Sequence, residues 1–151
     1  MFKEFVLASV HFVTIFALVA ILAIELALVR PGLDAATIKR LARIDLGFGL
    51  AAAAVILAGL ARVFFGLKGP AYYLANWIFW TKMGIFALVG LLSIQPTLRF
   101  LAWRRLVEAD ANAVPPLSDI MRVKRVIHLE AGLVLLLPIL AAAMARGYGL
   151  P

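Results

Sequence analysis

Hydrophobic positions along the chain gather into four long and almost uninterrupted runs. They cover residues 5–29, 46–65, 73–93 and 126–145. A helix of roughly 20 apolar residues crosses the ~30 Å hydrocarbon core of a bilayer, and each run reaches that length. The pattern therefore predicts an all-α fold, an integral membrane four-helix bundle that forms a single transmembrane domain over residues 1–151.

Polar residues concentrate in two connections, residues 30–45 and 99–125. Pro31 and Gly32 end the first apolar run, and Asp34 is a suitable N-cap for a short amphipathic helix over residues 33–43. We predict that this helix lies along the membrane surface. The second connection contains "EADANAVPPLSD", whose paired prolines and acidic residues predict an exposed loop.

The distribution of basic residues predicts the orientation of the bundle. Ten of the 15 Lys and Arg residues lie in the connections 30–45 and 99–125. By the positive-inside rule, these connections face the cytoplasm of a multi-pass protein in the bacterial inner (plasma) membrane, and both termini lie on the outer side. The net charge of +7 then indicates anionic lipid headgroups as partners, and no nucleic acid.

Composition supports the membrane assignment and excludes several kinds of chemistry. Hydrophobic residues make up 65% of the chain and charged residues 15%, with a mean hydropathy of +1.04. This balance lies far from that of soluble domains. Because the chain has no cysteine, disulfides, thiolate metal sites, iron–sulfur clusters and covalently attached haem are excluded.

Ionisable residues inside the apolar runs are the candidates for function, because each costs roughly 2.5–3.5 kcal/mol at the centre of a membrane helix. His11 in the first run and Lys82 in the third both lie about two turns from the predicted outer ends of their helices. We predict that they share one site in the outer half of the membrane. The alternative is that Lys82 extends through lipid past Trp77 and Trp80 to the headgroups.

A second layer of ionisable residues is expected in the inner half of the membrane. Its members are Glu25, Asp45, His128 and Glu130. We interpret Glu25 and Asp45 as headgroup-level partners of basic residues in the connections, namely Arg43, Arg122 and Arg125.

The role of His128 is left open among a haem ligand, a proton relay to Glu130 and an interfacial anchor. His11 and His128 are expected to differ in depth by roughly 15–20 Å. One iron is therefore not expected to bind both.

The four helices, with "LASVHF" in the first and "WTKMGIF" in the third, resemble the small bacterial membrane protoporphyrinogen oxidases of the HemJ type. They resemble more distantly the copper-resistance D membrane domain. The whole chain also resembles an uncharacterised four-helix bacterial membrane protein family related to both in architecture. In the oxidases, a histidine on the first helix and a lysine on the third form the functional pair, and haem is associated with the protein. The resemblance implies His11 and Lys82 as the catalytic pair.

The resemblance implies a haem- or porphyrin-binding redox protein, an oxidoreductase acting on a porphyrinogen-like substrate. Haem b is the expected cofactor, with His11 or His128 as the iron ligand and Lys82 and Arg62 as partners of the propionates. Phe12, Phe16, Phe79 and Phe86 are the expected walls of the apolar slot. By analogy with the family, electrons would pass from the haem to a quinone.

Two other classes of function remain open on the sequence. The intramembrane His, Lys, Glu and Asp residues suit a transport component for protons, metal ions or small molecules. A single four-helix bundle is small for alternating access, so a transporter of this kind would be a homo-oligomer. The third class is a ligand-free accessory subunit of a membrane complex.

Overall fold

A computed structural model describes residues 1–150, and all of their regular secondary structure is helical. The helices are α1 (Phe2–Leu28), α2 (Ala35–Phe65), α3 (Gly69–Leu74), α4 (Trp77–Ala109) and α5 (Leu117–Ala145). All but the short α3 are long and apolar enough to cross a membrane. The all-α four-helix membrane fold predicted from the hydrophobic pattern is thus confirmed.

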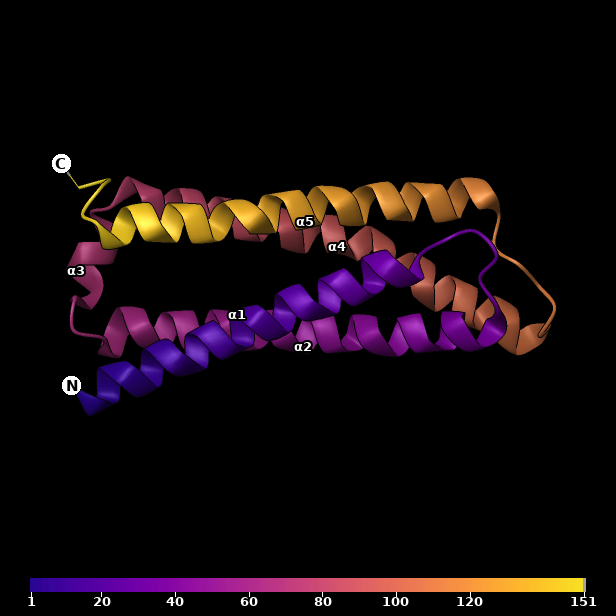
Figure 1. Cartoon of the computed structure of the whole chain (residues 1–151), viewed down its shortest axis with the longest axis horizontal. Coiled ribbons are helices and arrows are strands. Elements are labelled where there is room, and N and C mark those ends of the chain that lie inside the picture. The colour runs from indigo at the N-terminus through magenta and orange to yellow at the C-terminus, as the bar shows by residue number, and fades with distance from the viewer. Residues whose placement is uncertain (151) are drawn as a thin grey trace.

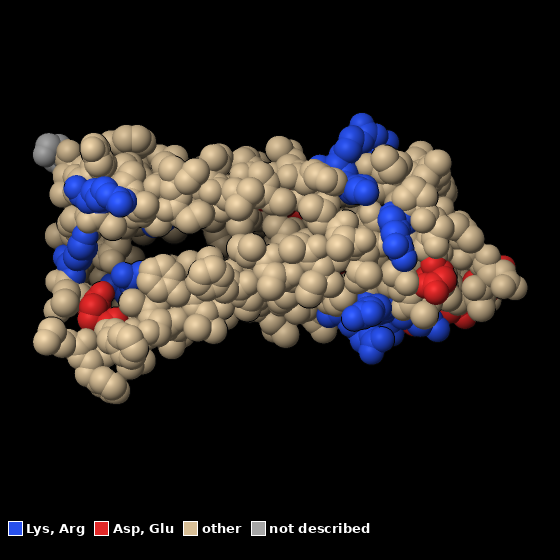
Figure 2. Space-filling model, viewed as in Figure 1, with Lys and Arg blue, Asp and Glu red and all other residues tan. Residues whose placement is uncertain are grey.

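The four long helices form a ring in which consecutive helices are neighbours. α1 packs on α2, α2 on α4, α4 on α5, and α5 returns to α1. Both termini and α3 lie at one end of the bundle, here named the outer end, and the 110–116 connection lies at the opposite, inner end (Figure 1). Toward the outer end a hollow separates the α1–α2 pair from the α4–α5 pair (Figure 2).

The middle of the bundle presents an apolar surface. Figure 2 shows a broad band without charged side chains between the charged residues at the two ends. Each long helix exposes a large hydrophobic side chain in this band: Phe16 (71% exposed), Leu57 (68%), Leu91 (67%) and Leu135 (64%). Continuous apolar exposure of this kind suits contact with lipid and not with water.

Helix α2 begins well before the predicted start at residue 46. Asp34 caps it, because its Oδ1 accepts a hydrogen bond of 2.8 Å from the backbone N–H of Thr37. Hydrogen bonding from Thr37 also holds the pKa of Asp34 below its ordinary value. Ile38 and Leu41 are fully buried, so the amphipathic segment that was predicted to lie on the membrane surface is instead the first part of α2.

The connection predicted as a loop over residues 99–125 is also mostly helical. α4 continues to Ala109 and α5 begins at Leu117, which leaves only residues 110–116 between them. Phe100 and Trp103 on α4 are buried, as are Ile120 and Val123 on α5. These apolar faces cover the start of α2, and that mutual burial explains why all three segments fold as helices beyond the apolar runs.

The chain end closes the outer end of the bundle. Asn76, which is fully buried, caps α4 by accepting a 2.9 Å hydrogen bond from the N–H of Ile78. Its Nδ2 donates to the carbonyl of Tyr148 at 2.9 Å, and the N–H of Trp77 donates to the carbonyl of Gly149. One buried amide therefore joins the start of α4 to the segment after α5.

Replacement of Asn76 by alanine should lower the free energy of unfolding by about 1–3 kcal/mol, because a helix cap is lost and a buried carbonyl loses its donor. Denaturant titration of the purified protein in detergent, followed by circular dichroism, measures the change. Asn112→Ala is the matched control in an exposed connection, with an expected change below about 0.5 kcal/mol. Equal stability of the two variants would contradict the role given to Asn76.

Candidate functional site

The outer half of the bundle brings together three basic side chains from three helices. His11 comes from α1, Arg62 from α2 and Lys82 from α4. The charges of Arg62 and Lys82 both act on the His11 imidazole, and the charge of Arg62 acts on Lys82. We call these three residues the outer cluster. The pair selected from the sequence, His11 and Lys82, therefore lies within electrostatic range, with Arg62 as the third member.

A glycine makes room for the imidazole. A Cβ atom built on Gly59 of α2 would lie 3.3 Å from His11 Cε1 and 3.9 Å from Nδ1, so the ring lies directly against the α2 backbone. Small residues allow such close approach between membrane helices. Nδ1 of His11 is buried and makes no hydrogen bond of standard geometry among residues 1–150, although the backbone of Val55 lies close enough to act on the ring. This nitrogen is therefore available to a proton, a hydrogen-bond donor or a metal ion.

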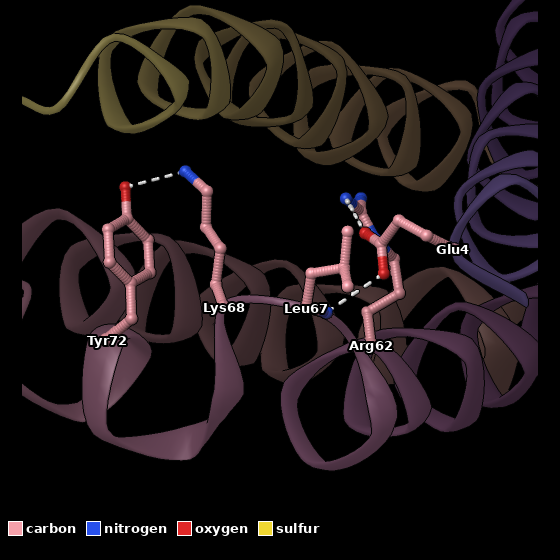
Figure 3. A network of polar contacts seen from close by, with 5 residues as sticks. All are labelled: Glu4, Arg62, Leu67, Lys68 and Tyr72. Atoms are coloured by element: carbon pink, nitrogen blue, oxygen red, sulfur yellow. Dashed lines mark hydrogen bonds and ion pairs between the residues drawn. The ribbon is translucent and has the colours of Figure 1, made fainter. Parts of the chain in front are cut away.

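Arg62 is the member of the outer cluster that contacts the first turns of α1. Its guanidinium lies 5.9 Å from the centre of the Phe12 ring, and its Nη2 lies 3.8 Å from Glu4 Oε1 (Figure 3). The same carboxylate accepts a 3.1 Å hydrogen bond from the N–H of Leu67 through Oε2. Nε of Arg62 is buried without a partner in the described chain. Glu4 thus satisfies Arg62 only in part.

Lys82 is half-buried, and among residues 1–150 its ammonium makes no hydrogen bond or ion pair. Lys68, which immediately precedes α3, differs in this respect. Its Nζ donates to the Tyr72 hydroxyl at 3.0 Å and lies 4.1 Å from the centre of that ring (Figure 3). Lys82 is therefore a half-buried lysine at membrane depth whose charge has no partner in the described chain.

The charge balance of the outer cluster indicates the chemistry that it can perform. The cluster holds an arginine, a lysine and an imidazole, and the one carboxylate paired with it is that of Glu4, whose Oε1 lies 3.8 Å from Arg62 Nη2. Uncompensated charge is unfavourable at membrane depth, so an additional anion would stabilise the cluster. An imidazole nitrogen can ligate a metal ion, and guanidinium and ammonium groups form charge-assisted hydrogen bonds with carboxylates.

The four predicted wall residues are spread over different surfaces. Phe12 lies beside Arg62 but is 54% exposed, and Phe16 is 71% exposed. Phe79 packs edge-on against Tyr73, with ring centres 5.7 Å apart, and Phe86 lines a groove between α2 and α4. The positions of these residues along the sequence do not determine which neighbouring helix each side chain contacts. They do not form a single slot in this structure.

His128 lies outside the outer cluster. It is exposed on α5, and its Nδ1 lies 2.8 Å from the carbonyl oxygen of Lys124. From their distances to the outer ends of α5 and α1, His128 and His11 differ in depth by about 12 Å. A single iron is not shared between them, as the sequence led us to expect.

The acidic residues of the predicted inner layer are arranged differently from our interpretation. Glu25 is 2% exposed, Asp45 7% and Glu130 1%, and none of them forms an ion pair within residues 1–150. The headgroup-level pairing with Arg43, Arg122 and Arg125 is therefore wrong. The early start of α2 and α5 places Asp45 and Glu130 well inside those helices, and Glu25, near the end of α1, is buried in the bundle, while the basic residues lie on exposed faces.

Two polar contacts within this half of the molecule were not anticipated. Thr97 of α4 donates a 2.9 Å hydrogen bond to Asp45 Oδ1, and Arg99 pairs with Asp119 at 3.0 Å. Glu4 was also missed at the outer end, although an acidic residue three positions from Met1 and ahead of an apolar run is a visible signal. Thr97 carries no comparable signal, since hydroxyl groups are common in membrane helices.

Comparison with known proteins gives one finding. Residues 3–149 match the family described as "Predicted membrane protein (DUF2214)". No curated protein and no solved structure matches. The match covers almost the whole of a chain with four apolar helices long enough to span a membrane. The chain therefore belongs to the DUF2214 family of predicted membrane proteins.

Proposed function

We propose that this membrane protein binds a b-type haem or a related porphyrin at the outer cluster and acts as a redox protein. The observation that carries the proposal is the convergence of His11, Arg62 and Lys82 from three helices with only one nearby carboxylate. A macrocycle with two propionates would supply the missing negative charge. When bound, a haem provides one-electron redox chemistry.

Each member of the cluster has a distinct task in this proposal. His11 holds the iron through the nitrogen that has no partner in the described chain. Arg62 and Lys82, on α2 and α4, hold the propionates and thereby connect the two helix pairs across the outer hollow (Figure 2). Glu4 keeps the Arg62 side chain oriented toward the outer end. The resemblance to HemJ-type oxidases adds the expectation that a porphyrinogen-like compound is the substrate.

Replacement of His11 by alanine should remove most of the bound haem, because the imidazole is the only iron ligand that the outer cluster offers. The measurement is the haem-to-protein ratio of protein purified from cells supplied with a haem precursor, read from the Soret absorbance and a pyridine extract. His128→Ala is the matched control, since it removes the only other histidine, which lies outside the cluster.

The spectra separate this proposal from its alternatives. Pigment that is lost in His11→Ala and kept in His128→Ala supports the outer site. Pigment lost only in His128→Ala would transfer the ligand to α5 and overturn the assignment. Wild-type protein without a Soret band, even after incubation with haemin, would favour a transport component or an accessory subunit.

A further inference from the structure

Three carboxyl groups from three different helices meet in the inner half of the bundle. They are Glu25 of α1, Asp45 of α2 and Glu130 of α5, and each lies within electrostatic range of at least one of the others. Thr97 of α4 donates to Asp45. Each of the four long helices therefore contributes one polar side chain to what we call the acidic cluster.

Oxygen atoms of this cluster lack partners despite deep burial. Glu25 is 98% buried and Glu130 99% buried, as their exposures of 2% and 1% imply, and Oε1 of each has no hydrogen bond within residues 1–150. A buried acceptor without a donor costs about 1–3 kcal/mol, and more when it is charged. These two oxygen atoms therefore indicate a bound proton, water molecule or ion that the polypeptide itself does not supply.

No basic side chain forms an ion pair with the cluster among residues 1–150. The cluster consists of the three carboxyls themselves and the uncharged hydroxyl of Thr97, which donates to Asp45. On α4, Arg99 is paired with Asp119 and Arg104 with Glu108, although Arg104 also lines a groove that Asp45 lines. Three carboxylates cannot all remain ionised in such surroundings, so positive charge must come from solution.

A groove connects the acidic cluster with the outside of the bundle. It lies between α2 and α4, has a volume of about 390 Å³ and is lined by small residues such as Gly49, Gly90 and Ser93. Asp45 and Thr97 line the same groove, as does Arg104. Asp45 therefore has access to the groove, while Glu25 and Glu130 are buried and do not line it.

We propose that Glu25, Asp45 and Glu130 form a proton-binding site, in which Asp45 exchanges protons with the groove and the two glutamates hold them in the bundle interior. A proton needs only one oxygen and a short path, and the cluster supplies both. A metal ion needs several ligands around one point, and residues 1–150 contain no group of three or more His, Asp or Glu residues placed to hold one. The proposal does not depend on a porphyrin at the outer cluster.

Dicyclohexylcarbodiimide tests the site in the full-length protein reconstituted in lipid. This apolar reagent adds to a protonated carboxyl group, whose O–H adds across the carbodiimide C=N bond, and rearrangement gives a stable N-acylurea with no leaving group. Peptide mass spectrometry locates the adduct. We expect at least about tenfold more adduct at Asp45 than at the exposed Glu108, with labelling that falls about tenfold per pH unit above its midpoint.

Substitutions within the cluster provide the readout that a purely structural role would not affect. Asp45→Asn removes the negative charge that acts on both glutamates while retaining side-chain size, so the midpoints for labelling of Glu25 and Glu130 should move to lower pH. Asp110→Asn, in the exposed connection between α4 and α5, should leave both midpoints unchanged. Size-exclusion profiles and helix content identify any variant that fails to fold, and labelling is compared only among folded variants.

Three results would overturn the proposal. The first is labelling of Asp45 no stronger than that of Glu108, and the second is a pair of glutamate midpoints that Asp45→Asn does not move. The third is protection of Asp45 by excess Na⁺ or K⁺ at constant pH, which would assign the cluster to a monovalent cation instead. None of these results depends on haem content, so they leave the function proposed for the outer cluster unaffected.

Discussion

Replacement of Lys82 by methionine is expected to reduce haem binding by about ten- to a hundredfold without preventing insertion or folding. Methionine keeps the long apolar stem and removes only the ammonium. A charge-assisted hydrogen bond contributes about 1.5–3 kcal/mol, which corresponds to this change in the dissociation constant. Titration of the purified protein with haemin, followed at the Soret band, measures the effect.

The expected loss follows from the surroundings of Lys82. Its ammonium is half-buried, has no hydrogen-bond or ion-pair partner in residues 1–150, and experiences the charge of Arg62. If Lys82 reached the headgroups through lipid, water and phosphate would satisfy it and methionine would be harmless. Haem affinity thus distinguishes an inward-facing lysine from a snorkelling one.

Two further variants sharpen this test. Lys82→Arg should retain part of the affinity, because arginine preserves the charge but presents it in a planar geometry. Lys68→Met is the matched control at the same end of the bundle, where the ammonium already has the Tyr72 hydroxyl as its partner. Haem affinity that stays at the wild-type level in Lys82→Met, or that falls equally in Lys68→Met, would remove Lys82 from the site.

The membrane-spanning part of the fold was predictable because four apolar runs of sufficient length leave few other structures. The depths expected for His11 and Lys82 come from a similar count, since a fixed rise per residue converts position in a helix into depth. The number of residues from a helix end does not show toward which side of the helix a side chain points. The placement of Phe16 and Phe86 on different surfaces, and of Glu25 toward the bundle interior, required the packed structure.

The ends of the helices were less predictable than their centres. Hydropathy declines where α2, α4 and α5 pass beyond the apolar runs, and amphipathic segments there suit a membrane surface as well as a helix bundle. Such a segment joins the bundle when another helix presents an apolar face against which it can pack. Ile38, Phe100 and Ile120 are each at most 1% exposed, which shows that such partners are present at the inner end.

Phe100 provides the most direct test of this inner core. Its side chain is fully buried, and its ring lies edge-on to that of Trp103 with centres 5.6 Å apart. It lies next to Arg99, which is ion-paired with Asp119 of α5, so the two helices are tied together at this level. A flexible loop over residues 99–125 would leave the same phenylalanine without fixed neighbours.

Phe100→Ala should therefore lower the free energy of unfolding by about 3–5 kcal/mol, the usual effect of removing a fully buried phenylalanine from a packed core. Leu98→Ala, on the same helix with a side chain that is 61% exposed, should change it by less than about 0.5 kcal/mol. Denaturant unfolding in detergent, followed by circular dichroism, compares both variants with the parent protein. If Phe100→Ala were as stable as Leu98→Ala, the helical extensions of α4 and α5 would not form a packed core. The carboxyl groups of the acidic cluster would then be open to water at the inner end, and the need for a bound proton would disappear.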